Sequence, residues 1–181
     1  MAGSGRRGPI GLILLALGPV LTAVYAGVNH AAIRMASKAQ VAGPQWQGGQ
    51  GRVGADGLTS LGVDAWRLTW WTAAFVGVLA VAFVVIGLLL RRRARGRTVL
   101  LVLSGVLIVP YAFAFLVAMI NPMKLLAELY KVPDFVSGIP SWQSSASFLL
   151  LAAGLSQAIG LSLAAGEGKR AGQAADAQQA P

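Results

Sequence analysis

Side chains that could act as acids, bases, nucleophiles or metal ligands are few in this sequence of 181 residues. His30 is the only histidine and cysteine is absent, which excludes bis-histidine haem, multi-histidine metal sites and thiolate chemistry within one chain. Four of the six acidic residues lie in two polar segments between apolar runs: Asp56, Asp64, Glu128 and Asp134. A paired-carboxylate or His–Asp site would have to come from these, and their spacing is not specific for one.

Motifs that carry chemistry are also missing from the sequence. It contains no Gly-rich phosphate loop, nucleophile elbow or metalloprotease motif. We therefore predict a protein that is not an enzyme, with no catalytic residue, no metal and no cofactor.

The composition indicates that these residues belong to a membrane protein. The chain is 56% hydrophobic and 12% charged, with a mean hydropathy of +0.66, and a soluble domain could not bury that much apolar surface. A helix needs about 20 apolar residues to cross a hydrocarbon core about 30 Å thick. Four segments without a charged residue meet that need: 9–29, 68–90, 98–120 and 144–166. The sequence thus predicts an all-α, four-transmembrane-helix bundle, a single membrane domain over residues 1–166.

Basic residues predict the orientation of this bundle. Lys and Arg concentrate on the cytoplasmic side of membrane spans. The three segments 1–8, 91–97 and 166–181 hold nine Lys or Arg in 31 residues, whereas segments 30–67 and 121–143 hold six in 61. The N-terminus, the short loop 91–97 and the C-terminus are therefore predicted to be cytoplasmic, and the two longer loops face outward.

The short inner loop contains five arginines, and we interpret them as a topology anchor that contacts anionic lipid of the inner leaflet. They are Arg91, Arg92, Arg93, Arg95 and Arg97. Seven residues between two spans offer no fold to present to bases, so nucleic acid is not expected as a partner. We attribute the net charge of +9 to membrane topology and not to nucleic-acid binding.

All five tryptophans fall on the predicted outer side. Four lie at or near the ends of spans, where amphipathic rings favour the membrane interface. We interpret Trp66, Trp70, Trp71 and Trp142 as an outer aromatic belt. A ligand-stacking box or a partner epitope is the alternative for the sequence WRLTWW.

The first apolar segment also resembles a secretory signal, with a basic start and small residues at Ala26. Cleavage after Ala26 would leave three spans. The apolar run continues for 21 residues, longer than an ordinary signal core, and so favours an uncleaved first helix.

The two outer segments differ in character. Residues 30–67 are rich in Gly, Gln and Ser and predict an extended or weakly ordered loop, with the first helix continuing for two or three turns past the membrane. Residues 121–143 open with Asn121 and Pro122, a helix start, and Pro133 ends the helical geometry. Met123, Leu126, Leu129 and Tyr130 would share one face of this short amphipathic helix.

Within the spans, three polar or helix-breaking positions could shape a cavity. Gln157 is the most polar side chain and is expected to hydrogen-bond across helices, with substrate contact as the minority interpretation. Pro19 and Pro110 lie mid-span and predict kinks in the first and third helices. Intramembrane acidic and basic residues mark proton and ion paths, and the four spans contain none, which argues against a proton-coupled pump.

Small residues at four-residue spacing permit close helix packing. In the fourth span they form one stripe: Ala152, Ser156, Gly160 and Ala164. Gly18, Thr22 and Ala26 form a second stripe in the first span, and we expect these faces to pair with each other or with a neighbouring subunit. Residues 167–181 are small and polar, without apolar periodicity, and predict a disordered cytoplasmic tail.

These features favour an accessory or scaffold subunit of a bacterial membrane complex, whose partners are membrane lipids and other membrane subunits or itself. The composition, rich in Ala, Gly, Val, Leu and Arg, indicates a GC-rich bacterial gene, and hence the bacterial cytoplasmic membrane. The alternative is a small-molecule or lipid binder, or a small transporter, with a cavity near Pro19, Pro110 and Gln157.

Overall fold

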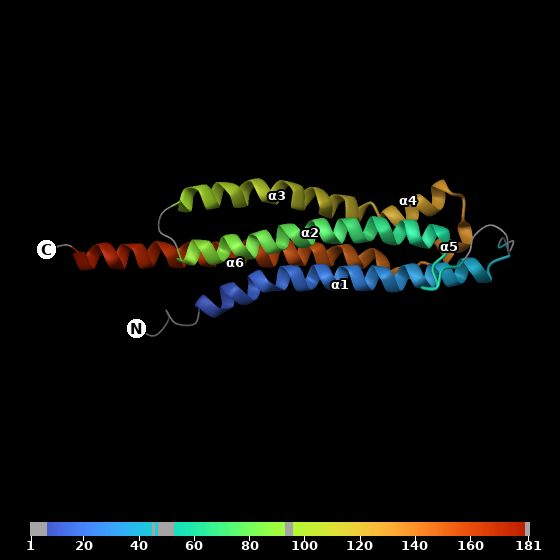
Figure 1. The fold of residues 1–181 in the computed structure, drawn as a ribbon, viewed down its shortest axis with the longest axis horizontal. Coiled ribbons are helices and arrows are strands. Elements are labelled where there is room, and N and C mark those ends of the chain that lie inside the picture. Colours follow the sequence, from blue (N-terminus) through green and yellow to red (C-terminus); the bar gives the residue numbers. More distant parts are fainter. Residues whose placement is uncertain (1–6, 45, 47–52, 93–95, 180–181) are drawn as a thin grey trace.

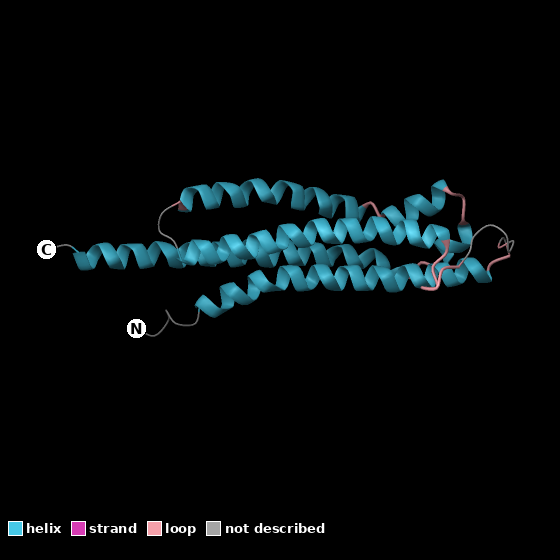
Figure 2. Cartoon of the chain, in the orientation of Figure 1, coloured by secondary structure: helices cyan, strands magenta, loops and turns pink. Residues whose placement is uncertain are grey.

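A computed structural model describes residues 7–44, 46, 53–92 and 96–179. The described residues form helices joined by short loops and turns (Figures 1 and 2). Four helices are long: α1 (Arg7–Ala42), α2 (Ser60–Arg92), α3 (Arg97–Met119) and α6 (Ser147–Gln179). Between α3 and α6 lie two short α-helices and a 3-10 helix: α4 (Pro122–Leu129), α5 (Pro133–Ser137) and η1 (Ser141–Ala146).

The long helices lie side by side (Figure 1). Helix α1 packs most extensively against α6 and then against α2, whereas α3 lies at the edge of the bundle and contacts mainly α2. The start of α1, the end of α2, the start of α3 and the end of α6 lie at one end of the bundle (Figure 1). Helices α4 and α5 lie at the opposite end with the connection from α1 to α2.

The expectation of four apolar spans is confirmed at the level of length and composition. Four helical segments are long and apolar enough to cross a membrane: Pro9–Ala42, Ser60–Arg91, Thr98–Met119 and Ser141–Gly166. Their surfaces agree with this, because large apolar side chains lie exposed along them, such as Val78 at 70% and Phe113 at 67% exposure. Surfaces of this kind would be costly in water but are ordinary against lipid.

A first apolar core fills the space between the long helices. Its buried side chains come from all four of them and include Leu15, Val76, Phe83, Ala114 and Leu150. Close approach of α1 to α6 depends on Gly160, since a Cβ there would lie 2.9 Å from Leu15 Cγ and 3.0 Å from the Gly11 carbonyl oxygen. Small residues therefore allow the closest helix pair of the bundle to form.

A second core, separate from the first, lies at the end that carries α4 and α5. We call the region built around it the cap: residues 30–42 of α1, 54–67, α4, α5 and η1. Buried within the cap are Ile33 and Ala36 from α1, Leu58, Leu61 and Ala65 from residues 58–65, and Met123, Ala127 and Phe135 from α4 and α5. Phe135 is completely buried and anchors α5 against α1.

The cap corrects the prediction of an extended loop over residues 30–67. Helix α1 continues to Ala42 and α2 begins at Ser60, so much of that segment is helical. At about 1.5 Å per residue, α1 is about 54 Å long, well beyond a hydrocarbon core of about 30 Å. The extension of α1 agrees with the two or three further turns predicted for it. The start of α2 at Ser60, eight residues before the predicted span, was not predicted, because Leu61 and Ala65 find their apolar partners in other parts of the cap. Residues 47–52 of that loop lie outside the described part of the chain.

Helix α4 begins at Pro122, as the sequence indicates. Of the predicted apolar face, Met123 is buried and Leu126 packs against the core of the cap, whereas Leu129 and Tyr130 are exposed. Ala127, which the predicted face did not include, is the second buried residue of the helix.

Helix α6 also runs further than expected, through Gln179, where the sequence suggested disorder from residue 167. The segment is rich in Ala, Gln, Glu, Lys and Arg, which are good helix formers. Extending an existing helix needs no new nucleus, so an apolar period is not required for these residues to remain helical.

Lys131 follows the end of α4 with a left-handed backbone, at φ 55°. Its N–H bonds the Glu128 carbonyl at 3.1 Å, and this position after a helix normally carries glycine. We expect Lys131→Gly to raise the stability of the detergent-purified protein by about 0.5–1 kcal/mol. Lys131→Ala, which keeps the Cβ and removes the same charge, should bring no gain in thermal unfolding, and an equal gain from both variants would contradict this account.

Candidate functional site

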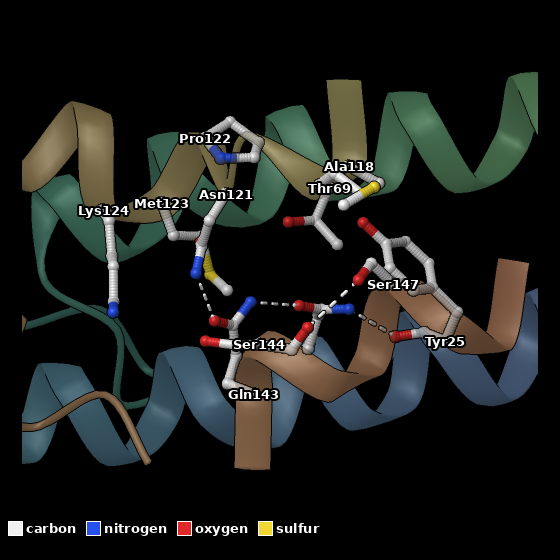
Figure 3. Close-up of a pocket in the computed structure, with 12 residues that line it drawn as sticks. Tyr25, Thr69, Ala118, Asn121, Pro122, Met123, Lys124, Gln143, Ser144 and Ser147 are labelled. Carbon is white, nitrogen blue, oxygen red and sulfur yellow. Dashed lines mark hydrogen bonds between the residues drawn. The ribbon is translucent and has the colours of Figure 1, made fainter. Parts of the chain in front are cut away.

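A chain of side-chain amides crosses the structure where the cap meets the bundle. Asn121 Nδ2 donates to Gln143 Oε1 at 2.7 Å, and Gln143 Nε2 donates to Asn29 Oδ1 at 2.9 Å. Asn29 Nδ2 in turn donates to the Tyr25 carbonyl at 2.9 Å. The dashed bonds in Figure 3 follow this series from the start of α4, through η1, to α1. The amide chain therefore ties three parts of the fold together.

Local backbone geometry sets each amide in place. Asn121 separates α3 from α4 and has a left-handed backbone at φ 55°, which asparagine tolerates better than most residues. Pro122 then starts α4. Gln143 lies in η1, where its N–H bonds the Pro140 carbonyl at 3.0 Å. Asn29 lies on the buried side of α1, at the last residue of the span predicted from the sequence.

Beside the amide chain is a cavity of about 230 Å³, which we call the polar cavity (Figure 3). Hydroxyl and amide groups line much of it, from Thr69, Asn121, Gln143, Ser144 and Ser147. The Thr69 and Ser147 hydroxyls donate to the Ala65 and Ser144 carbonyls, at 2.9 and 3.0 Å, so their oxygens can still accept.

One group in the lining of the polar cavity carries a charge: Lys124 is exposed there and supplies a positive charge. Asn121 Oδ1 is buried and has no hydrogen-bond partner among the described residues, but it has almost no accessible surface and is closed to a ligand in the cavity. The cavity thus offers a cation and several hydroxyls.

A second cavity of about 230 Å³, which we call the apolar trough, lies between α3 and α6. Its lining is apolar and includes Ile108 and Phe115 of α3 and Leu151 and Leu155 of α6. Tyr111 also contributes, and its hydroxyl donates to the Leu150 carbonyl at 3.3 Å. Gly154 leaves room for this ring, since a Cβ there would lie 2.9 Å from Tyr111 Cε1.

Gln157 is buried at the centre of the bundle, with 1% of its surface exposed. Its Nε2 donates to the Ala80 carbonyl of α2 at 2.8 Å, and its side chain packs over Gly18 of α1. This is the cross-helix hydrogen bond that the sequence suggested, and it joins α6 to α2. Gln157 Oε1 has no hydrogen-bond partner among the described residues, and the side chain also borders the apolar trough.

The candidate cavity predicted from Pro19, Pro110 and Gln157 is only partly assembled. Pro19 and Pro110 are half-buried within α1 and α3, and neither belongs to the lining of the apolar trough or the polar cavity. Gln157 alone of the three lies at the trough.

The predicted small-residue stripe lies mainly inside the bundle. Ser156, Gly160 and Ala164 are buried and Ala152 is exposed. Gly18 and Thr22 on α1 are buried as well, and Thr22 faces Gly77 of α2. Gly160 packs against Leu15 and Gly11 of α1, and Gly18 packs against Gln157 of α6, so each stripe contributes a glycine to the contact between α1 and α6.

The predicted aromatic belt divides into exposed and packed rings. Trp70, Trp71 and Trp142 are exposed, whereas Trp66 is half-buried. The Trp66 ring stands edge-on to His30 at 4.5 Å and tilted to Trp70 at 6.0 Å between centroids. His30 therefore packs on an aromatic ring, a role that requires no acid–base chemistry.

Of the five arginines of the inner loop, Arg91 lies exposed at the end of α2. Arg92 and Arg97 belong to the ends of α2 and α3, but their side chains, with Arg93 and Arg95, lie outside the described part of the structure. The end of α2 and the start of α3, which flank this loop, lie at the end of the bundle opposite the cap (Figure 1).

The described residues include no group of three His, Asp or Glu side chains that could hold a metal ion. Asp56 instead accepts the Leu58 N–H at 3.2 Å and fixes the loop before α2. The groups assembled at the two cavities can hydrogen-bond and make apolar contacts. No family model, curated protein or solved structure matches this chain.

Sequence reasoning did not identify Asn29, Asn121 and Gln143 as a group. Each stands close to an end of an apolar run, where polar residues are common, and 114 positions separate Asn29 from Gln143. The signal available in the sequence was that each amide lies at or next to the end of a predicted span. The packing of α1 against η1 is what brings Asn29 and Gln143 together.

We expect Gln143→Leu to destabilise the protein by about 2–4 kcal/mol, because it leaves the amides of Asn29 and Asn121 without their partner in a buried setting. Ser145→Leu, in the same 3-10 helix but exposed, is the matched control. Thermal unfolding in detergent measures both, and similar values for the two variants would refute the structural role of the amide chain.

Proposed function

We propose that this chain is a multi-pass protein of a bacterial cytoplasmic membrane, with the cap outside and both termini inside. The proposal is supported by the high density of basic residues in segments that the fold gathers at one end of the bundle. Arg91, Arg92, Arg93, Arg95 and Arg97 then lie at the inner leaflet and contact anionic lipid.

Within that membrane the protein serves as a non-enzymatic accessory or scaffold subunit of a larger complex. One observation carries this proposal: the cap has its own apolar core and still exposes large apolar side chains on α4. Leu125, Leu129 and Tyr130 are 50%, 76% and 59% exposed, beside an open groove lined by Val132 and Val136. A rigid layer with exposed apolar residues is suited to docking the extramembrane part of another subunit.

Capture from native membranes tests the subunit proposal. The tagged protein, purified in mild detergent, is expected to bring a partner at constant stoichiometry, and Leu129→Gln combined with Tyr130→Ser should lower that recovery at least 10-fold. Val41→Gln, an exposed apolar change at the end of α1, is the control and should leave recovery unchanged. Purification without a stoichiometric partner, or equal recovery with the α4 variant, would overturn the proposal.

Ligand binding is the second candidate function, as a small-molecule or lipid binder or a small transporter. It is favoured by the polar cavity with its hydroxyls and Lys124 and by the apolar trough that borders Gln157. Scaffolding and ligand binding are compatible, because the docking residues Leu125, Leu129 and Tyr130 line neither cavity.

A further inference from the structure

We propose that the contact between α3 and α6 binds one outer-leaflet glycerophospholipid with a hydroxyl-bearing head group. An acyl chain lies in the apolar trough and the head group in the polar cavity. This inference rests on the second candidate function, ligand binding, and specifies its ligand class and its site.

The two cavities follow each other along the same pair of helices. On α3, the lining passes from Ile108 and Phe115 in the trough to Ala118 and Met119 in the polar cavity. Helix α6 and η1 run antiparallel to α3. Along them the lining passes from Leu161 to Leu150 in the trough and then to Ser147 and Gln143 in the polar cavity. The two spaces therefore form an apolar and a polar part in the order found in a phospholipid.

The length of this path fits one leaflet. The eleven-residue step from Ile108 to Met119 covers about 16 Å at 1.5 Å per residue, about half of a hydrocarbon core of 30 Å. A single acyl chain has that reach within its own leaflet. A ligand that spans the membrane would need a path twice as long.

The polar cavity lies at the depth of lipid head groups. Two of its lining residues, Thr69 and Gln143, are direct neighbours of Trp70 and Trp142, which are exposed. Tryptophans of this kind gather at the membrane–water interface. The proposed sidedness assigns this interface to the outer leaflet.

The groups in the polar cavity select the head group. The Thr69 and Ser147 oxygens can accept from hydroxyl groups, which glycerol or another hydroxylated head group carries and choline does not. Lys124 attracts the phosphodiester and opposes an ammonium group such as that of ethanolamine. An anionic, hydroxylated head group suits both the hydroxyls and the cation.

The trough is open to lipid because α3 is held at the edge of the bundle. Few contacts join α3 to α6, and Val109 and Phe113 on α3 are exposed. The apolar lining between the two helices offers an acyl chain more contact than the flat outer surface of either helix.

Native mass spectrometry of the intact protein tests the proposal. Phosphatidylglycerol and phosphatidylcholine with identical acyl chains are each added to the delipidated protein in detergent. A one-to-one complex with phosphatidylglycerol is expected, retained at least 10-fold better than the complex with phosphatidylcholine. Equal retention of the two lipids would overturn the head-group assignment.

Variants separate the two parts of the site. Ala112→Trp fills the trough and should lower phosphatidylglycerol binding at least 10-fold, whereas Val109→Trp, also exposed on α3 but outside the trough lining, should not. Lys124→Gln removes the positive charge from the polar cavity, and Lys131→Gln, also exposed but outside that lining, is its control. Equal binding by each variant and its control would overturn the placement of the lipid.

Other ligands distinguish failure of this inference from failure of the binding function. Glycerol 3-phosphate that binds as well as the lipid would show a free phosphate site and overturn the role of the trough. A different small molecule retained from native membranes would overturn the lipid assignment and preserve the binding function. A protein that retains nothing and binds neither lipid would overturn both.

Discussion

Gly18→Leu is expected to destabilise the bundle by about 3 kcal/mol or more. The new side chain enters the space of the Gln157 amide, which packs directly over Gly18, and it breaks the Gln157 hydrogen bond to the Ala80 carbonyl. Overpacking a tight core and leaving buried polar groups unpaired each cost about 1–3 kcal/mol. Thermal or denaturant unfolding in detergent measures the loss.

Gly27→Leu is the matched control, since it lies in the same helix and a Cβ there meets nothing within 4 Å. We expect this variant to unfold within about 0.5 kcal/mol of the parent protein. A double-mutant cycle adds a second check, because Gly18→Ala should cost less when Gln157→Ala has already vacated the space. Equal stability of the Gly18→Leu and Gly27→Leu variants would show that Gln157 does not pack against α1.

Gly138→Val is expected to release α5 from α1 and open the cap. A Cβ at this position would overlap the Ala39 side chain and lie 2.9 Å from Ala36 Cα, a backbone atom that cannot move aside. The backbone at Gly138 is right-handed, so the effect comes from crowding alone. We expect a cost of about 2–3 kcal/mol and faster hydrogen exchange in α4 and α5.

Ser137→Val adds a similar volume at the neighbouring exposed position and serves as the control. It removes only an exposed hydrogen bond to the Asp134 carbonyl, at 3.0 Å. Exchange in α4 and α5 should stay near that of the parent protein. Unchanged exchange in the Gly138→Val variant would contradict the packing of the cap against α1.

The four long helices could be predicted because each apolar run carries its own signal. Hydropathy alone identified all four segments, and the close α1–α6 contact was suggested by Gly160 and its small neighbours. The cap could not be predicted in the same way. Ile33 and Phe135 lie about a hundred residues apart, and their burial depends on contacts that no local pattern encodes.

The candidate site shows the same limit. Gln157 was identified because a polar side chain inside an apolar run has few explanations, and its bond to α2 fits that reasoning. The amides of Asn29, Asn121 and Gln143 stand at or next to the ends of the apolar runs, where polar residues are expected without further meaning. Prolines mark local backbone geometry, and for that reason Pro19 and Pro110 did not locate the cavities.

Both functional proposals depend on the cap facing outward, and cysteine labelling in intact cells tests this most directly. The chain has no cysteine, so each single substitution reports on one position alone. A membrane-impermeant maleimide should label Ser141→Cys, exposed in η1, in intact cells. It should label Ala175→Cys, near the end of α6, only after the membrane is permeabilised. The reverse pattern, or labelling of both positions in intact cells, would contradict the account.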